Sequence, residues 1–184
     1  MIFSSIKYTI VYLLIIVAIQ ESCCQTDREQ FPQSWIGTWT GDLEIYKGLD
    51  LVNSIPMSLK IDTTAQSDRY AYFINYGMSP EGLRPYYLHV VDSSKGQYIL
   101  DEANGIRIEM YKLDNQLFSS FQVMGSLIQT VTHVAGDVMH YTIYAGSSKP
   151  ISITGDTIMG ADTIPPVETY SMPQVQKAIL KRTP

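Results

Sequence analysis

The sequence predicts an all-β protein, an antiparallel up-and-down barrel of eight to ten strands with a short C-terminal helix. Between residues 37 and 145, runs of alternating polar and apolar residues are separated by turn residues every eight to twelve positions, which is typical of a β-sandwich or barrel. The chain is also rich in residues that suit half-buried strands, including 13 tyrosines. Because closure removes the exposed edges of a long meander, a barrel is favoured and a two-sheet sandwich is the alternative.

Residues 1–24 have the layout of a secretory signal peptide. Lys7 precedes an apolar run from Tyr8 to Ile19, and small and polar residues follow. The run is shorter than the roughly 20 residues that span a bilayer. We therefore expect a cleaved signal peptide over 1–24 and a barrel domain over 25–184. The protein would be exported, to a periplasmic or extracellular location.

Both cysteines, Cys23 and Cys24, lie at the expected cleavage boundary. Cleavage after Cys24 would leave a soluble domain without a disulfide framework. Lipidation of Cys23 or Cys24 is the alternative, and it would anchor the protein to the envelope. Contact with a membrane is expected only in that second case.

The alternating pattern predicts nine strands in chain order. They cover residues 37–46, 55–62, 69–76, 84–91, 97–103, 106–113, 116–124, 127–134 and 138–145.

Four two-residue turns fix the expected register of the later strands. The turns are centred on Asn104-Gly105, Asp114-Asn115, Gly125-Ser126 and Gly136-Asp137. They predict the cross-strand pairs Glu102–Arg107, Ile108–Phe121, Val123–Ile128 and Val134–Met139.

Paired residues share one face of a sheet, so the four turns also predict which side chains point inward. The predicted inward face is mostly apolar: Ile99, Asp101, Ile106, Ile108, Met110, Ser119, Phe121, Val123, Ile128, Thr130, Thr132, Val134, Met139, Tyr141 and Ile143. The predicted outward face is polar: Glu102, Arg107, Glu109, Gln122, Gln129, His133, His140 and Thr142.

After Ala145 the pattern changes to a segment rich in Gly, Pro, Ser and Thr, which predicts a long wrapping connection with room for one more strand. The stretch "SMPQVQKAILKR" then predicts a short helix. Ser171 and Gln174 have capping-box spacing, and Val175, Ile179 and Leu180 would fall on one side. A disordered tail is the alternative for this stretch.

The stretch "GTWTGDLEI" resembles the first strand of the lipocalins and their calycin relatives, which begin with a Gly-x-Trp motif, here Gly37-Thr38-Trp39. The resemblance implies that Trp39 plugs the closed end of a barrel. Gly41 lies on the face of Trp39, where it lets the ring or a neighbouring strand approach closely. The Thr-Asp-Tyr turn and the usual disulfide of lipocalins are absent, and the late arginine that covers their tryptophan has no clear counterpart. The resemblance is therefore to a calycin-like barrel.

Six residues are the candidates for binding a small, largely apolar ligand inside such a barrel. Hydroxyl groups among Ile, Met and Phe side chains fit either a mostly apolar pocket or a filled interior with bridging water. An inward carboxylate could anchor a polar or cationic group, or lie at the rim in water. The candidates are Asp101, Ser119, Phe121, Thr130, Thr132 and Tyr141.

Other chemistry finds little support in the sequence. The net charge is −5 with no basic run, so we expect no nucleic-acid partner. His133 and His140 face one another, but a metal site needs more ligands. Asp42 and Glu44 alternate with apolar residues and should face water. The pattern predicts no cofactor and no catalytic residue.

Two alternatives to ligand binding remain open at this point. The first is an isomerase- or cyclase-like enzyme that uses the same cavity, with Asp101 and Tyr141 as the acid–base pair. The second is an envelope or assembly protein whose barrel interior is filled by side chains.

Overall fold

The computed structural model describes residues 31–183, and the chain divides into two units, residues 1–34 and residues 35–184. The strands described below all lie in the second unit. The expected signal peptide over 1–24, with Cys23 and Cys24, falls outside the described residues. Within residues 31–183, no helix has the length and apolar character needed to cross a membrane.

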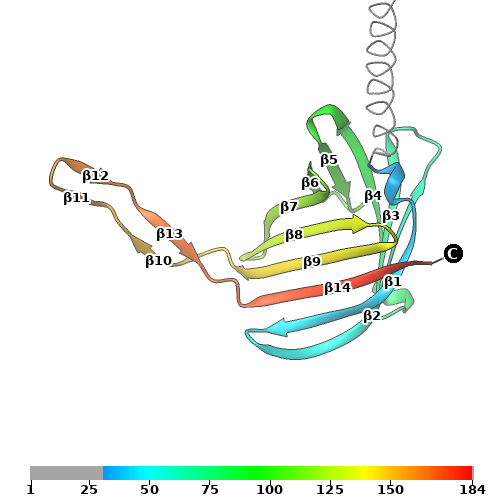
Figure 1. Ribbon diagram of the computed structural model, residues 1–184, viewed down its shortest axis with the longest axis horizontal. Coiled ribbons are helices and arrows are strands. Elements are labelled where there is room, and N and C mark those ends of the chain that lie inside the picture. The colour runs from blue at the N-terminus through cyan, green and yellow to red at the C-terminus, as the bar shows by residue number, and fades with distance from the viewer. Residues whose placement is uncertain (1–30, 184) are drawn as a thin grey trace, which may run out of the picture. The chain divides into compact units, whose positions relative to one another are not determined.

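Ten of the strands in residues 31–183 form a closed antiparallel barrel in the order β1-β14-β9-β8-β7-β6-β5-β4-β3-β2 (Figure 1). The expectation of an all-β, up-and-down barrel is confirmed. The strands are β1 (Gly37–Lys47), β2 (Asp50–Thr63), β3 (Arg69–Tyr76), β4 (Leu83–Asp92), β5 (Gln97–Asp101), β6 (Arg107–Leu113), β7 (Gln116–Val123), β8 (Ser126–Ala135), β9 (Val138–Ser147) and β14 (Gln174–Thr183). Three short 3₁₀ helices accompany them: η2 (Gln33–Trp35), η3 (Pro80–Gly82) and η4 (Ser93–Lys95).

The predicted C-terminal helix is wrong, because its residues form β14. This strand pairs with both β1 and β9 and closes the barrel. Its side chains alternate with a period of two: Ala178 and Leu180 are buried, whereas Ile179 is 62% exposed. A short helix would satisfy its backbone groups but gain little else alone, whereas the strand fills the space between two open sheet edges.

Residues 150–170 form an arm that leaves the barrel between β9 and β14. β10 (Pro150–Thr154) pairs with β13 (Val167–Tyr170), and β11 (Thr157–Met159) pairs with β12 (Asp162–Ile164). Figure 1 shows the arm extending away from the barrel, and its apolar side chains are exposed, with Ile158 at 73%. The expectation that this segment wraps the barrel is wrong. Because β9 and β14 pair with one another, the arm has no vacant barrel edge to join.

Two of the four predicted turns are confirmed, and one is displaced without consequence for the inward face. Leu113 pairs with Gln116 around Asp114-Asn115, and Val134 pairs with Met139 around Gly136-Asp137. Val123 pairs with Ser126 rather than Ile128, because the turn is Met124-Gly125. Both of its central residues have positive φ, as a type I′ turn requires. The turn moves by one residue, which shifts the cross-strand pairing by two residues, so each side chain keeps its predicted face.

The fourth turn is one residue longer than predicted. The cross-strand pairing therefore shifts by one residue, and this exchanges the faces of β5. Asp101, not Glu102, pairs with Arg107, and the loop is Ala103–Gly105. The Asp101 carboxylate accepts a hydrogen bond from the Ala103 N–H at 2.8 Å and so stabilises the longer loop. A one-residue slip reverses the orientation of every side chain in a strand. The predicted inward orientation of Ile99 and Asp101 is therefore wrong, as is the outward orientation of Glu102.

The ladder between β6 and β7 is short. It covers three pairs, from Tyr111–Phe118 to Leu113–Gln116, so the predicted pair Ile108–Phe121 lies beyond its end. Both of these side chains nevertheless face the barrel interior.

Trp39 closes one end of the barrel. Its side chain is fully buried, and its Nε1 donates a hydrogen bond to the Trp35 carbonyl oxygen at 3.0 Å. The guanidinium of Arg182 lies 4.1 Å from the Trp39 ring centroid and donates to the Ile36 carbonyl oxygen. The Arg182 guanidinium thus covers one face of the Trp39 ring. A Cβ at Gly41 would lie 2.4 Å from the Ile179 carbonyl oxygen, so the glycine lets β14 approach closely.

The opposite end of the barrel carries the β1–β2, β3–β4, β5–β6 and β7–β8 turns and the root of the arm. Two apolar residues at its turns, Leu49 and Met124, are 98% and 100% exposed. At the root of the arm, the Ser147 N–H donates to the Ser171 carbonyl oxygen at 3.1 Å. We call this the arm end of the barrel.

Substitutions at two adjacent positions of β14 should have very different effects on stability. Leu180→Ala removes a fully buried side chain and should lower the free energy of unfolding by about 2–5 kcal/mol. Ile179→Ala, one residue away but facing solvent, should cost less than about 1 kcal/mol. Urea denaturation of the two variants measures the difference. Similar losses at the two positions would contradict the alternating strand.

Candidate ligand-binding cavity

The barrel encloses a cavity of about 350 Å³. Its lining comes from β3, β4, β5, β6, β7, β8, β9 and β14 and from the β5–β6 loop. The lining residues are Tyr72, Ile74, Tyr76, Tyr86, Leu100, Glu102, Ile108, Met110, Ser119, Phe121, Ile128, Thr130, Thr132, Tyr141, Ile143, Ala145 and Gln176. The volume falls in the range of about 300–1,000 Å³ that small-molecule sites occupy.

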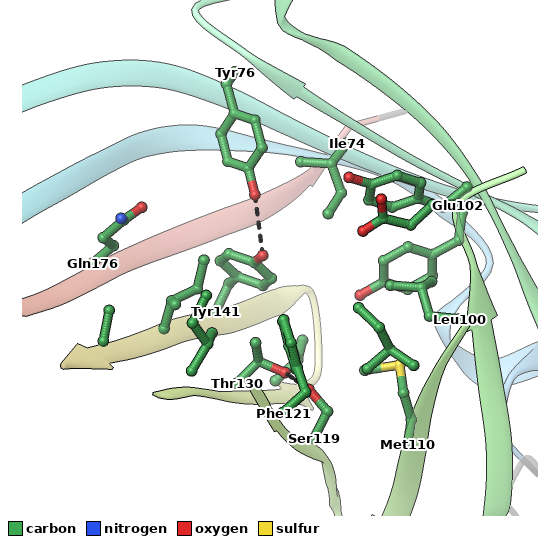
Figure 2. A pocket seen from close by; sticks show the side chains of 17 residues that line it. Ile74, Tyr76, Leu100, Glu102, Met110, Ser119, Phe121, Thr130, Tyr141 and Gln176 are labelled. Atoms are coloured by element: carbon green, nitrogen blue, oxygen red, sulfur yellow. Dashed lines mark hydrogen bonds between the residues drawn. The ribbon is translucent and has the colours of Figure 1, made fainter. Parts of the chain in front are cut away.

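Five of the six candidate binding residues line this cavity: Ser119, Phe121, Thr130, Thr132 and Tyr141. Ser119 and Thr130 are cross-strand partners on β7 and β8, and their hydroxyl oxygens are 2.7 Å apart in a hydrogen bond. Figure 2 shows Phe121 beside this pair. The alternation of β7, β8 and β9 was enough to place these residues from the sequence.

Asp101, the sixth candidate, does not line the cavity. Its carboxylate lies on the outer face, 3.7 Å from Nε2 of His89 and 3.9 Å from Nε of Arg107. These two partners come from the strands on either side of β5. Asp101 therefore joins β4, β5 and β6 across the outside of the barrel.

A cluster of tyrosines lines the cavity, and the sequence reasoning missed three of its four members. Tyr72 and Tyr76 come from β3, Tyr86 from β4 and Tyr141 from β9. The hydroxyl oxygens of Tyr76 and Tyr141 are 3.2 Å apart, and Figure 2 shows the two side chains pointing toward one another. The alternation in "RYAYFINY" was the available signal, because Tyr72, Ile74 and Tyr76 share one face of β3.

Burial keeps these tyrosines neutral. It raises the pKa of Tyr72, Tyr76 and Tyr141, since a buried phenolate loses its hydration. Burial also raises the pKa of Tyr86 to about 12, and the negative charge of Glu102 and a hydrogen bond to it act in the same direction. At neutral pH all four groups are therefore hydroxyls that donate and accept hydrogen bonds.

Glu102 and Gln176 are the remaining strongly polar groups of the lining. Glu102 follows β5 at the arm end of the barrel, and its Oε2 accepts a hydrogen bond from Nδ2 of Asn104 at 3.2 Å. Gln176 enters from β14, the strand that the sequence predicted to be a helix. Figure 2 shows Glu102 and Gln176 on opposite sides of the pocket, with Tyr76 and Tyr141 between them.

The other candidate sites lie on the outer face. His133 and His140 are cross-strand partners whose rings stack in parallel, with centroids 4.5 Å apart. Stacked rings point their nitrogen atoms in parallel rather than toward a shared ion. Glu44 accepts a hydrogen bond from the Tyr46 hydroxyl at 2.8 Å, and Asp42 is exposed. Among residues 31–183, no three His, Cys, Asp or Glu side chains gather as metal ligands.

No protein-family model matches the chain, and neither does any curated protein. The function proposed below therefore depends on the geometry of the cavity and on the residues themselves.

The stacked histidines should make the stability of the barrel depend on pH. Burial, and then the positive charge of His140, holds the pKa of His133 below its ordinary value of 6.5. The unfolded chain then binds more protons than the folded one, so stability is present above about pH 6.5 and falls as the pH drops through the folded pKa. Between about pH 7.5 and about pH 5.5, the melting temperature of His133→Gln should fall less than that of the wild type.

The variant His140→Gln is the matched control for this experiment. It removes only the second cause of the pKa shift of His133. The fall in its melting temperature with pH should therefore lie between the fall of the wild type and that of His133→Gln. Equal falls in all three proteins would mean that His133 titrates alike in the folded and unfolded chains.

Proposed function

We propose that the protein binds a small, largely apolar molecule inside the barrel, as a calycin-like binding protein. The observation that carries this proposal is the cavity of about 350 Å³. Most of its lining is aliphatic or aromatic, and a few hydroxyls are placed to orient a ligand. A barrel of ten strands is wider than the eight-stranded barrels whose interior side chains just fill the space.

The closed end supports the calycin-like part of the proposal. Gly37-Thr38-Trp39 opens β1, and the tryptophan fills the base of the barrel under the Arg182 guanidinium. This arrangement resembles the lipocalin pattern of an opening Gly-x-Trp motif and a late arginine. The short β6–β7 ladder leaves the two strands without backbone pairing where Ile108 and Phe121 line the cavity.

The proposal includes export of the protein. It rests on the signal-peptide layout of residues 1–24, with cleavage after Cys24 as the favoured route and lipidation of Cys23 or Cys24 as the alternative.

Two other functions find less support. The enzyme hypothesis needed Asp101 and Tyr141 as an acid–base pair, but these two side chains face opposite sides of the barrel wall. An envelope or assembly protein with a filled interior would leave no cavity of this size. Ligand binding is therefore the function that we propose.

Filling the cavity with a side chain tests the proposal. Thr130 projects into the cavity from β8, so Thr130→Phe should occupy the space and abolish binding of the neutral fluorescent probe N-phenyl-1-naphthylamine, while the barrel stays folded. In the wild type, the probe at a hundredfold excess over its dissociation constant should stabilise the fold by about 2.7 kcal/mol. Fluorescence titration and thermal melts measure the two effects.

Two control variants separate cavity filling from other effects. Thr130→Val keeps the volume but loses the hydrogen bond to Ser119, so it should still bind the probe. Gln129→Phe adds the same ring on the outer face and should also bind. A packed interior would instead give no probe binding in the wild type, together with an overpacking cost of about 1–3 kcal/mol in Thr130→Phe.

A further inference from the structure

We propose that the cavity selects ligands that carry a protonated amine, with the Glu102 carboxylate as the counter-ion and tyrosine rings as the surrounding walls. This inference rests on the proposed binding function and specifies the chemical class of the ligand. An alkyl or aromatic amine is the class that fits.

The charges of the lining are the first support. Glu102 is the single carboxylic acid among the lining residues, and the lining contains no Lys, Arg or His. The positive charge of Arg84 reaches Tyr76 and Tyr86 from outside the lining. Among the lining side chains themselves, Glu102 carries the one formal charge. Because opposite charges attract and like charges repel, a cationic group is favoured near Glu102 and an anionic group is disfavoured.

The hydrogen-bond donors to Glu102 are neutral, and the nearby Arg84 guanidinium donates to the carbonyl oxygens of Glu81 and Leu83 instead. Within residues 31–183, no ion pair joins Glu102 to a basic side chain. The nearest basic residue in the sequence, Arg107, is turned to the outer face, where it pairs with Asp101. Glu102 accepts hydrogen bonds from neutral donors, the Asn104 amide and the Tyr86 hydroxyl.

The aromatic walls supply the second half of an ammonium site. Tyr76, Tyr86 and Tyr141 line the same cavity as Glu102, and they are neutral at neutral pH. The faces of aromatic rings attract cations, with a strength of about 0.5–2 kcal/mol that grows as water is excluded. Ring faces and a carboxylate together recognise an ammonium group, whereas the aliphatic side chains Ile108, Ile128 and Ile143 accept an apolar tail.

The experiment compares three probes with the same eight-carbon chain: octylamine, octanol and octanoate. At neutral pH octylamine is protonated like a lysine side chain, octanol is neutral and octanoate is an anion. Displacement of N-phenyl-1-naphthylamine measures their affinities. The wild type should bind octylamine about tenfold more tightly than octanol, and octanoate most weakly.

Glu102→Gln is the decisive variant, and Asp101→Asn is its matched control. Glu102→Gln removes the cavity charge, so octylamine and octanol should bind with affinities within about threefold of one another, and octanoate should improve. Asp101→Asn removes a charge one residue away on the outer face, so the preference for octylamine should persist. Octanol binding should be unchanged in Asp101→Asn, which shows that the cavity is intact.

The outcomes separate this inference from the function on which it rests. Octanol binding without a preference for octylamine in the wild type would overturn the amine inference and leave the binding function standing. A preference that survives Glu102→Gln would show that Glu102 is not the counter-ion and would also overturn it. Failure of all three probes and of N-phenyl-1-naphthylamine would overturn both.

Discussion

The pairing of β14 with β1 on one side and β9 on the other is the constraint on which the rest of the structure depends. Without β14, the meander from β1 to β9 would have two open edges, and the inward faces of those edge strands would be exposed to water. With it, Leu43 and Leu180 are buried, and Trp39 is enclosed. The same strand carries Arg182 to the Trp39 ring, so closure of the wall and closure of the base depend on one segment.

Closure also determines what kind of interior the protein has. The inward side chains near the Trp39 end fill the barrel. The inward side chains in the middle and at the arm end surround the cavity. Hydroxyl groups there pair with one another, Ser119 with Thr130 and Tyr76 with Tyr141, so their polar atoms are satisfied without closing the space. A polar lining that satisfies itself can accept an apolar ligand without leaving buried hydrogen-bonding groups unpaired.

The sequence was a good guide wherever local chemistry decides the structure. Strands with regular alternation and tight turns, such as β8 and β9 around Gly136-Asp137, could be placed with their partners. The orientations of Asp101 and Glu102 could not be predicted from the sequence, because one extra loop residue reversed the faces of β5. The Asp101 carboxylate itself stabilises this longer loop. The C-terminal strand was missed for another reason: its spacing suits a helix, and only the two open edges of the folded meander make it a strand. Long-range pairing of this kind leaves no signal in a single sequence.

The central claim is that the closed barrel holds an open cavity that a ligand can enter. Nuclear magnetic resonance chemical-shift mapping with octanol tests it most directly, because it reports on each residue separately. The account predicts that the perturbed residues cluster at inward positions such as Ser119, Ile128 and Tyr141. Outward positions on the same strands, such as Gln129 and His140, should change little. Perturbations confined to the exposed arm or the outer wall, or none at all, would contradict the claim.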